Sequence, residues 1–198
     1  MHTEDESELI KLVLAGKNGA FKSLIQRYER LVLHIVTPLV GISEDREDLC
    51  QDVFIKVYQG LGSFKQNSRL STWIGNIAYH TCLNFLRKRK VIFLEDIRLT
   101  GKEHDDTTQS GWSFNESLLL KETVTPEQEI VKKETSDTFE DAINKLPEMQ
   151  RLAVILFHYE ELSLQEISLM LHIPENTIKS YLFRGRKRLK ELIDLEAI

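Results

Sequence analysis

Positively charged side chains gather at two places in this chain. One group ends the stretch SRLSTWIGNIAYHTCLNFLRKRK (residues 68–90), and the chain has no Asp or Glu from Lys65 to Lys90. The second group lies in NTIKSYLFRGRKRLK (residues 176–190), which also contains no acid. Lysine and arginine bind phosphates by charge and can bond guanine edges, so both stretches are predicted to bind nucleic acid. The formal net charge of −5 hides this pattern, because the charged residues between the two groups are mainly acidic.

The first stretch also carries groups that can read bases. Asn76, His80 and Asn84 recur every four residues and therefore share one face of a helix. Amide and imidazole groups can hydrogen-bond base edges, and aromatic neighbours can stack on unpaired bases. We expect this face to contact bases while the cations Arg87 to Lys90 hold the backbone; a merely solvated polar face is the alternative.

Enzymatic and metal chemistry find little support in the sequence. The histidines are scattered, and HExxH, GxSxG and glycine-rich phosphate motifs are missing. Cys50 and Cys82 lie in apolar helical patterns without a CxxC motif, which favours reduced core thiols over a metal site. The acids of EDREDLCQD (residues 44–52) suit the first turns of a helix and a solvated or partner-binding face. We expect no enzyme activity, no metal and no cofactor.

Helices must position these groups. Apolar residues recur at helical spacing in the first 90 residues and again from about residue 136, and no stretch alternates with period two. GKNG (residues 16–19) is predicted to turn the chain, and a helix is expected over residues 71–90. We therefore predict an all-α fold of two small helical domains, residues 1–91 and 136–198.

Residues 92–135 are predicted to form an acidic, flexible linker between the two domains. Their periodicity is weak and they are rich in acids, Gly, Ser and Thr. Trp112 and Phe114 are unexpected in a spacer and indicate either a local packing anchor or a contact with a partner. The N-terminus opens on acids rather than a basic signal region, and no apolar run approaches the ~18 residues of a membrane span. We expect a cytoplasmic protein.

Residues 163–190 follow the pattern of a helix-turn-helix. Ser163 and Glu166 form a capping box before a short helix over residues 164–171, and a break at HIPEN (residues 172–176) precedes a longer basic helix. Gly185 within that helix should be tolerated at a cost of about 1 kcal/mol. The alternative is a solvated basic helix end. Because the second helix enters the major groove, its candidate DNA-binding residues are Thr177, Lys179, Ser180, Phe183, Arg184, Arg186, Lys187 and Arg188.

Two stretches together resemble the extracytoplasmic-function (ECF) sigma factors, the small sigma-70-type factors of bacterial RNA polymerase. DREDLCQDVFIKVYQGLGSFKQNSRLSTWIGNIAYHTCLNFLRKRK is similar to region 2 of that family, and LPEMQRLAVILFHYEELSLQEISLMLHIPENTIKSYLFRGRKRLKEL is similar to region 4. The resemblance implies a factor that binds core RNA polymerase and directs promoter-specific initiation. In that case the N-terminal domain melts the −10 element and the helix-turn-helix reads the −35 element.

The resemblance also implies roles for individual residues. The residues that would bind the β′ clamp helices of core polymerase are Asp48, Gln51, Asp52 and Phe54. The residues that would bind the −10 element, including a flipped base, are Phe64, Lys65, Asn67, Arg69, Ile77, His80, Asn84, Arg87, Lys88, Arg89 and Lys90. The β flap would lie near Leu152 to Tyr159, and the linker would pass the active centre. Many relatives carry Asn at the position of His80, so base preference there is open.

Partners and alternatives complete the expectations. The resemblance implies an anti-sigma factor as a partner, although no residue of this chain indicates one directly. A one-component DNA-binding regulator could use the same helix-turn-helix, but it would bind duplex DNA alone, usually as a dimer. An enzyme with a DNA-binding tail is the remaining alternative, and the lack of a catalytic constellation argues against it.

Overall fold

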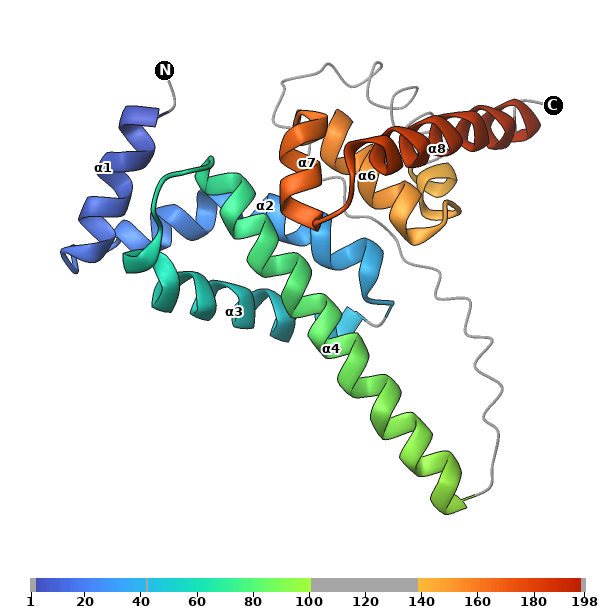
Figure 1. The fold of residues 1–198 in the computed structure, drawn as a ribbon, viewed down its shortest axis with the longest axis horizontal. Helices are drawn as coiled ribbons and strands as arrows, with labels where there is room; N and C mark the ends of the chain where they lie inside the picture. The colour runs from blue at the N-terminus through green and yellow to red at the C-terminus, as the bar shows by residue number, and fades with distance from the viewer. Residues whose placement is uncertain (1–2, 42, 101–138, 197–198) are drawn as a thin grey trace, which may run out of the picture. The chain divides into compact units, whose positions relative to one another are not determined.

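The described part of the chain forms two helical units. The computed structural model describes residues 3–41, 43–100 and 139–196, with side chains for residues 5–41, 45–90 and 139–194. All regular structure within these ranges is helical, so the all-α prediction is confirmed. One unit contains α1 to α4; the other contains residues 139–144, α6, α7 as far as Ser168, and α8 (Figure 1).

The first unit is a bundle around α2. Its described elements are α1 (Thr3–Leu14), α2 (Ala20–Leu39), α3 (Ser43–Gly60), the short 3-10 helix η1 (Leu61–Ser63) and α4 (Leu70–Thr100). Gly16 and Gly19 have φ values of 68° and 81° in the turn between α1 and α2. Glycine adopts such angles readily, which explains why the chain turns at the predicted GKNG.

The core of this unit is apolar and fully enclosed. Helices α3 and α4 pack on α2 and on each other. Val32 and Ile35 of α2, Val53 of α3 and Ile74 of α4 are each 0% exposed. Burying side chains of this size stabilises a fold by about 1.5–3 kcal/mol each, so this face of α4 is held firmly while its other side remains available.

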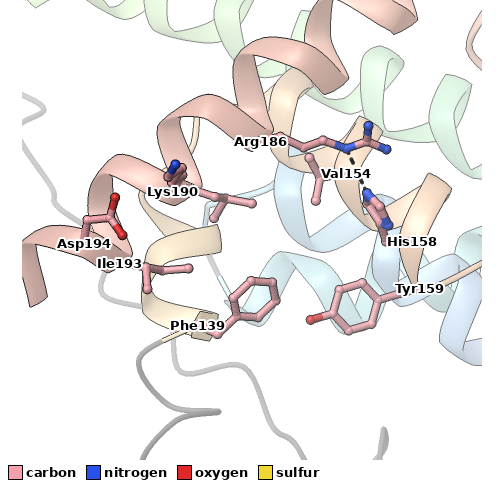
Figure 2. A pocket seen from close by; sticks show the side chains of 9 residues that line it. Phe139, Val154, His158, Tyr159, Arg186, Lys190, Ile193 and Asp194 are labelled. Carbon is pink, nitrogen blue, oxygen red and sulfur yellow. Dashed lines mark hydrogen bonds between the residues drawn. The ribbon is translucent and has the colours of Figure 1, made fainter. Parts of the chain in front are cut away.

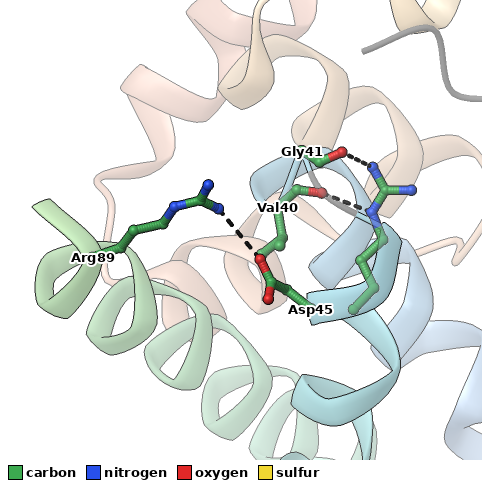
Figure 3. Close-up of polar contacts among 5 residues, drawn as sticks. Val40, Gly41, Asp45 and Arg89 are labelled. Carbon is green, nitrogen blue, oxygen red and sulfur yellow. Dashed lines mark hydrogen bonds and ion pairs between the residues drawn. The ribbon is translucent and has the colours of Figure 1, made fainter. Parts of the chain in front are cut away.

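A buried arginine fixes the corner between α2 and α3. Arg46 is 6% exposed; its Nε donates to the carbonyl oxygen of Val40 at 2.7 Å, and its Nη2 donates to that of Gly41 at 2.9 Å (Figure 3). These carbonyls lie at the end of α2, where the helix provides no internal donors. The side chain thus terminates α2 and sets the start of α3.

The two cysteines are free thiols of the bundle, as the sequence predicts. Cys82 on α4 is buried and Cys50 on α3 is half-buried. Burial raises the pKa of Cys50 to about 11 and that of Cys82 to about 12. Because the thiolate is the reactive form, these raised pKa values make both thiols unreactive at neutral pH. Cys82 lies in the core as predicted, whereas Cys50 is only partly covered.

Helix α4 is longer than the sequence pattern predicts. The expected helix ended at Lys90, whereas α4 runs from Leu70 to Thr100 (Figure 1). Residues 91–100, VIFLEDIRLT, contain no Gly or Pro, and the first glycine is Gly101, so nothing in the chain breaks the helix earlier. The first residues of the predicted linker are therefore helical, and Trp112 and Phe114 lie outside the described residues.

The second unit is built on the crossing of α6 and α8. Residues 139–144 are helical and are followed by α6 (Glu148–His158), α7 (Leu164–Leu171) and α8 (Glu175–Glu196). Pro147 precedes α6 directly, where a residue without a backbone N–H is tolerated. Leu152 and Leu156 of α6 and Ile178 of α8 are completely buried.

Neither a membrane span nor a metal site is found in the part of the chain that the structure covers. Among the described helices none is long and apolar enough to cross a bilayer. Within the same residues no three His, Cys, Asp or Glu side chains cluster to hold a metal ion.

Candidate nucleic-acid interfaces

The helix-turn-helix has a capped start. The Ser163 backbone N–H donates to Glu166 Oε2 at 2.9 Å, and the Glu166 N–H donates to Ser163 Oγ at 3.2 Å. These reciprocal bonds form the predicted capping box, and α7 begins at Leu164 and ends at Leu171 as expected. The capping box and the helix bounds are confirmed.

The turn after α7 is made by a histidine rather than a glycine. His172 has a φ of 54°, and the Ile173 N–H returns to the carbonyl oxygen of Ser168 at 3.3 Å. This is the bond pattern of a Schellman helix end, which usually carries Gly at the left-handed position. Pro174 then accepts from the N–H of Thr177 at 2.8 Å, which starts α8 within three residues.

Helix α8 divides into a buried and an exposed face. Ile178, Leu182 and Leu189, which recur at core-facing helical spacing, are at most 6% exposed, whereas Leu192 at the same spacing is only half-buried. Lys179, Ser180, Arg184, Lys187 and Arg188 are exposed and Thr177 is half-buried at the first turn. Phe183 is 71% exposed, more than any other large hydrophobic residue among those described. An exposed aromatic between cations suits apolar contact with a thymine methyl group beside phosphate and guanine contacts.

Arg186 differs from the other predicted DNA-binding residues of α8. Its Nε donates to His158 Nε2 at 3.1 Å (Figure 2). Its guanidinium lies 5.3 Å from the ring centre of Phe157. Burial, and secondly the charge of Arg186, lower the pKa of His158, so the neutral ring is available as acceptor. Arg186 therefore joins α8 to α6, whereas Lys179, Phe183 and Arg184 extend outward.

Gly185 allows α6 and α8 to approach closely. A Cβ atom at this position would lie 2.9 Å from Val154 Cγ2 and 3.5 Å from the carbonyl oxygen of Gln150. Sequence reasoning treated Gly185 as a tolerated defect of the helix. The structure shows instead that the missing side chain makes room for α6.

An open groove lies on the second unit beside this crossing. It has a volume of about 600 Å³ and is lined mainly by apolar side chains (Figure 2). Arg186 and Lys190 are the cations among its lining residues, and Asp194 is the acid. Its apolar lining comprises Phe139, Val154, Tyr159, Leu189 and Ile193. The groove was not predicted, because its wall combines residues more than 50 positions apart.

In the first unit, the loop before α4 presents the predicted −10 residues. Lys65, Asn67 and Arg69 are exposed, and Phe64 is half-buried with its ring 5.2 Å from that of Trp73. A Cβ on Gly60 would lie 3.2 Å from Trp73, so the indole packs against the end of α3. The packing of Trp73 against Phe64 and Gly60 thus anchors the loop.

On α4, part of the polar stripe and the cations are accessible. His80 and Asn84 are exposed, whereas Asn76 and Ile77 are half-buried. Arg87 Nη2 donates to Asn84 Oδ1 at 2.8 Å. This bond turns the amide oxygen of Asn84 toward a cation, so Asn84 keeps its NH₂ group as a donor for other partners.

Arg89 is paired within the protein. Its Nη1 lies 3.3 Å from Asp45 Oδ2 at the start of α3 (Figure 3). Lys88 and Lys90, by contrast, are exposed. The basic cluster is therefore not uniform. One of its four cations links two helices of the bundle.

The outer face of α3 carries most of the residues that the resemblance assigns to polymerase. Asp48, Gln51 and Asp52 are exposed, but Phe54 is only 8% exposed and belongs to the core. Ile55, 53% exposed, continues the exposed face instead. Its spacing of three and four residues from Asp52 and Gln51 could have identified it.

Comparison with known proteins accounts for both units. The family model described as "Sigma-70 region 2" matches residues 24–91, and "Sigma-70, region 4" matches residues 136–189. The ECF RNA polymerase sigma factor SigW of Bacillus subtilis is 33% identical over 187 residues, 94% of this chain and 96% of that protein. The chain belongs to the ECF sigma factors.

Other members of the family agree with this assignment. The ECF RNA polymerase sigma-E factor of Escherichia coli is 31% identical over 90% of this chain and 89% of its own length. The sigma factor RpoE of Bartonella quintana, solved with the anti-sigma factor NepR, has the same fold with a TM-score of 0.64. It is 22% identical and the match covers 89% of this chain and 98% of that one. An ECF sigma factor is a transcription initiation factor, not an enzyme, as the sequence led us to expect.

Proposed function

We propose that this ECF sigma factor reads the −35 element with the outer face of α8 and the −10 element with the loop and polar face of α4. The supporting observation is the capped helix-turn-helix whose second helix exposes Lys179, Phe183 and Arg184 together. Lys179 and Arg184 contact base edges, Phe183 contacts a thymine methyl, and Lys187 and Arg188 hold phosphates.

The test is run-off transcription with purified core RNA polymerase on a library of genomic fragments. New start sites that share two spaced upstream elements are expected only when the protein is present. Tight binding to duplex DNA by the protein alone, without new start sites, would refute the proposal in favour of a one-component regulator.

The −35 contacts are tested with single variants on the promoter so identified. Arg184→Ala and Lys179→Ala should each lose about 1–3 kcal/mol of discrimination at particular −35 positions. Lys22→Ala, which removes an exposed cation from α2, is the matched control. Equal response across all −35 variants would remove both residues from the interface.

In the first unit, His80 faces the flipped −10 base together with Phe64, Lys65 and Asn67. Imidazole offers a different set of donors and acceptors from the amide that many relatives have at this position. His80→Asn should therefore change the tolerance at one −10 base, measured by transcription from promoters randomised there. If every −10 base responds alike, the pocket lies elsewhere.

The exposed face of α3 is the proposed contact with the β′ clamp helices. Asp48, Gln51, Asp52 and Ile55 form it, while Phe54 supports it from the core. Ile55→Ala should weaken binding to core polymerase about tenfold, since a truncated apolar anchor typically loses more than 1 kcal/mol. Gln59→Ala, also exposed on α3, is the control. Equal affinity of the two variants would exclude this face.

Two further partners belong to the proposal. The β flap binds near α6, in the segment Leu152 to Tyr159, and a cytoplasmic anti-sigma protein holds the factor inactive. Sigma factors of similar fold were solved as complexes with the anti-sigma factors NepR and CnrY. A saturating selection for constitutive transcription should yield mutations in a gene whose product binds this protein. If no such gene emerges, the anti-sigma partner is refuted.

A further inference from the structure

The groove on the second unit exposes apolar side chains that an apolar partner could cover. Phe139 is 37% exposed, and Tyr159 and Ile193 are half-buried beside it (Figure 2). Apolar surface of this kind in a concave site is stabilised when another apolar group covers it. The cations Arg186 and Lys190 line the same groove, so a ligand with an acid next to its apolar groups would fit its charge as well.

One segment of this chain has this composition. Residues 112–120, WSFNESLLL, combine Trp112, Phe114 and three leucines with a single acid, Glu116, and contain no cation. Trp112 and Phe114 are the only Trp, Phe or Tyr residues between positions 101 and 138. The segment lies outside the described residues, and none of the promoter, clamp-helix or flap contacts proposed above uses it.

The length of chain between this segment and the groove allows the two to come into contact. The described chain resumes at Phe139, which is itself a wall of the groove, and Leu120 precedes it by only 19 residues. Nineteen residues reach up to about 65 Å when extended, so length does not prevent contact. A tether of this length gives an effective concentration in the millimolar range, so that a segment with a dissociation constant of about 100 µM occupies the groove roughly nine tenths of the time.

We propose that residues 112–120 bind in the groove between residues 139–144, α6 and α8 of their own molecule. Trp112 and Phe114 cover the apolar wall formed by Phe139, Tyr159 and Ile193, and Glu116 meets Arg186 or Lys190. The segment occupies a surface next to the proposed flap contact on α6, so we expect it to be released when polymerase binds. This consequence, unlike the contact itself, rests on the proposed function.

Tryptophan fluorescence provides the first test. The chain has two tryptophans, so Trp73→Phe leaves Trp112 as the reporter in the full-length protein. Without polymerase or DNA, its emission should be blue-shifted and its acrylamide quenching constant severalfold lower than that of N-acetyltryptophanamide. Ile193→Arg, which places a charge in the groove, should return both values toward those of the free compound.

Controls separate loss of binding from loss of folding. Glu191→Ala, an exposed change on α8 outside the groove, should leave the quenching unchanged. Ile193→Ala is the milder groove variant, and circular dichroism with the amide spectrum of α6 and α8 shows whether each variant is folded. An intermediate quenching constant in folded Ile193→Ala would support the contact.

Each of three results would overturn the proposal. The first is a quenching constant of Trp112 in the parent protein equal to that of N-acetyltryptophanamide. The second is protection of Trp112 from acrylamide that persists in a folded Ile193→Arg variant. The third is protection that increases with protein concentration, which would show that a second copy of the chain fills the groove. Because this assay contains no polymerase, its failure leaves the run-off result intact, and failure of run-off transcription leaves the fluorescence result intact.

Discussion

Adding a single methyl group at Gly185 should destabilise the second unit. In an exposed helix interior, Gly→Ala stabilises by about 1 kcal/mol, because alanine restricts the unfolded chain and favours the helix. At Gly185 the new Cβ would lie 2.9 Å from Val154 Cγ2, closer than carbon atoms tolerate. The sign of the effect therefore reports whether α6 and α8 cross as closely as the structure shows.

The magnitude follows from how little Val154 can move. Its side chain is 2% exposed and β-branched, so it has few alternative rotamers. Relief requires a shift of one helix, and overpacking of this kind costs about 1–3 kcal/mol. After the helix propensity gain is subtracted, Gly185→Ala should lose about 1 kcal/mol of unfolding free energy.

Urea unfolding of the full chain, followed by amide signals of α6 and α8, measures this change. In a Val154→Ala background the added methyl has room, and Gly185→Ala should then stabilise, which gives a coupling of about 2 kcal/mol in the double-mutant cycle. Gly62→Ala is the control, since its Cβ would meet only Leu14 at an ordinary 3.8 Å. Stabilisation by Gly185→Ala in the parent background would refute the close crossing.

Three other changes test the supports of the two surfaces. Ser163→Ala should destabilise the second unit by about 1 kcal/mol through loss of the cap, measured by the same urea assay, and an unchanged midpoint would exclude the capping box. Arg46→Met leaves carbonyls at the end of α2 without their donor and should lose about 1–3 kcal/mol; in thermal unfolding, a melting temperature equal to that of the parent would contradict this. His158 has a lowered pKa in the folded state, so the unfolded chain binds more protons and the second unit should lose stability as pH falls through about 6.5. Proton NMR should place its titration below that of a model peptide, and a midpoint above it would reverse the sign.

The helices and the helix-turn-helix could be predicted because their signals are local. The capping box of Ser163 and Glu166, the apolar spacing of α8 and the turn at GKNG each involve residues a few positions apart. The family resemblance added a role for each motif. The end of α4 was missed because the change in composition at residue 92 suggested a linker, although residues 91–100 contain no Gly or Pro that would end the helix.

What the sequence could not predict depends on tertiary contact. From the sequence alone Gly185 looks like a defect in a helix, and only the packing of α6 against α8 explains it. Phe54 likewise looks like a candidate contact with polymerase, and only the packed bundle shows that it is buried. The groove likewise joins Phe139 to Ile193 across 54 positions. No periodicity connects such residues, so only the packed structure brings them together.

The cations held within the protein have a consequence for the ionic strength dependence of promoter binding. Arg89 is paired with Asp45, and Arg186 donates to His158. Each phosphate neutralised on duplex DNA releases counterions and adds about 0.9 to the slope of log K against log salt. If these two arginines keep their partners in the complex, the slope is shallower by about 1.8 than a count of the basic residues suggests. In that case Asp45 and His158 reduce how strongly salt controls occupancy of a promoter, because each holds an arginine that would otherwise neutralise a phosphate.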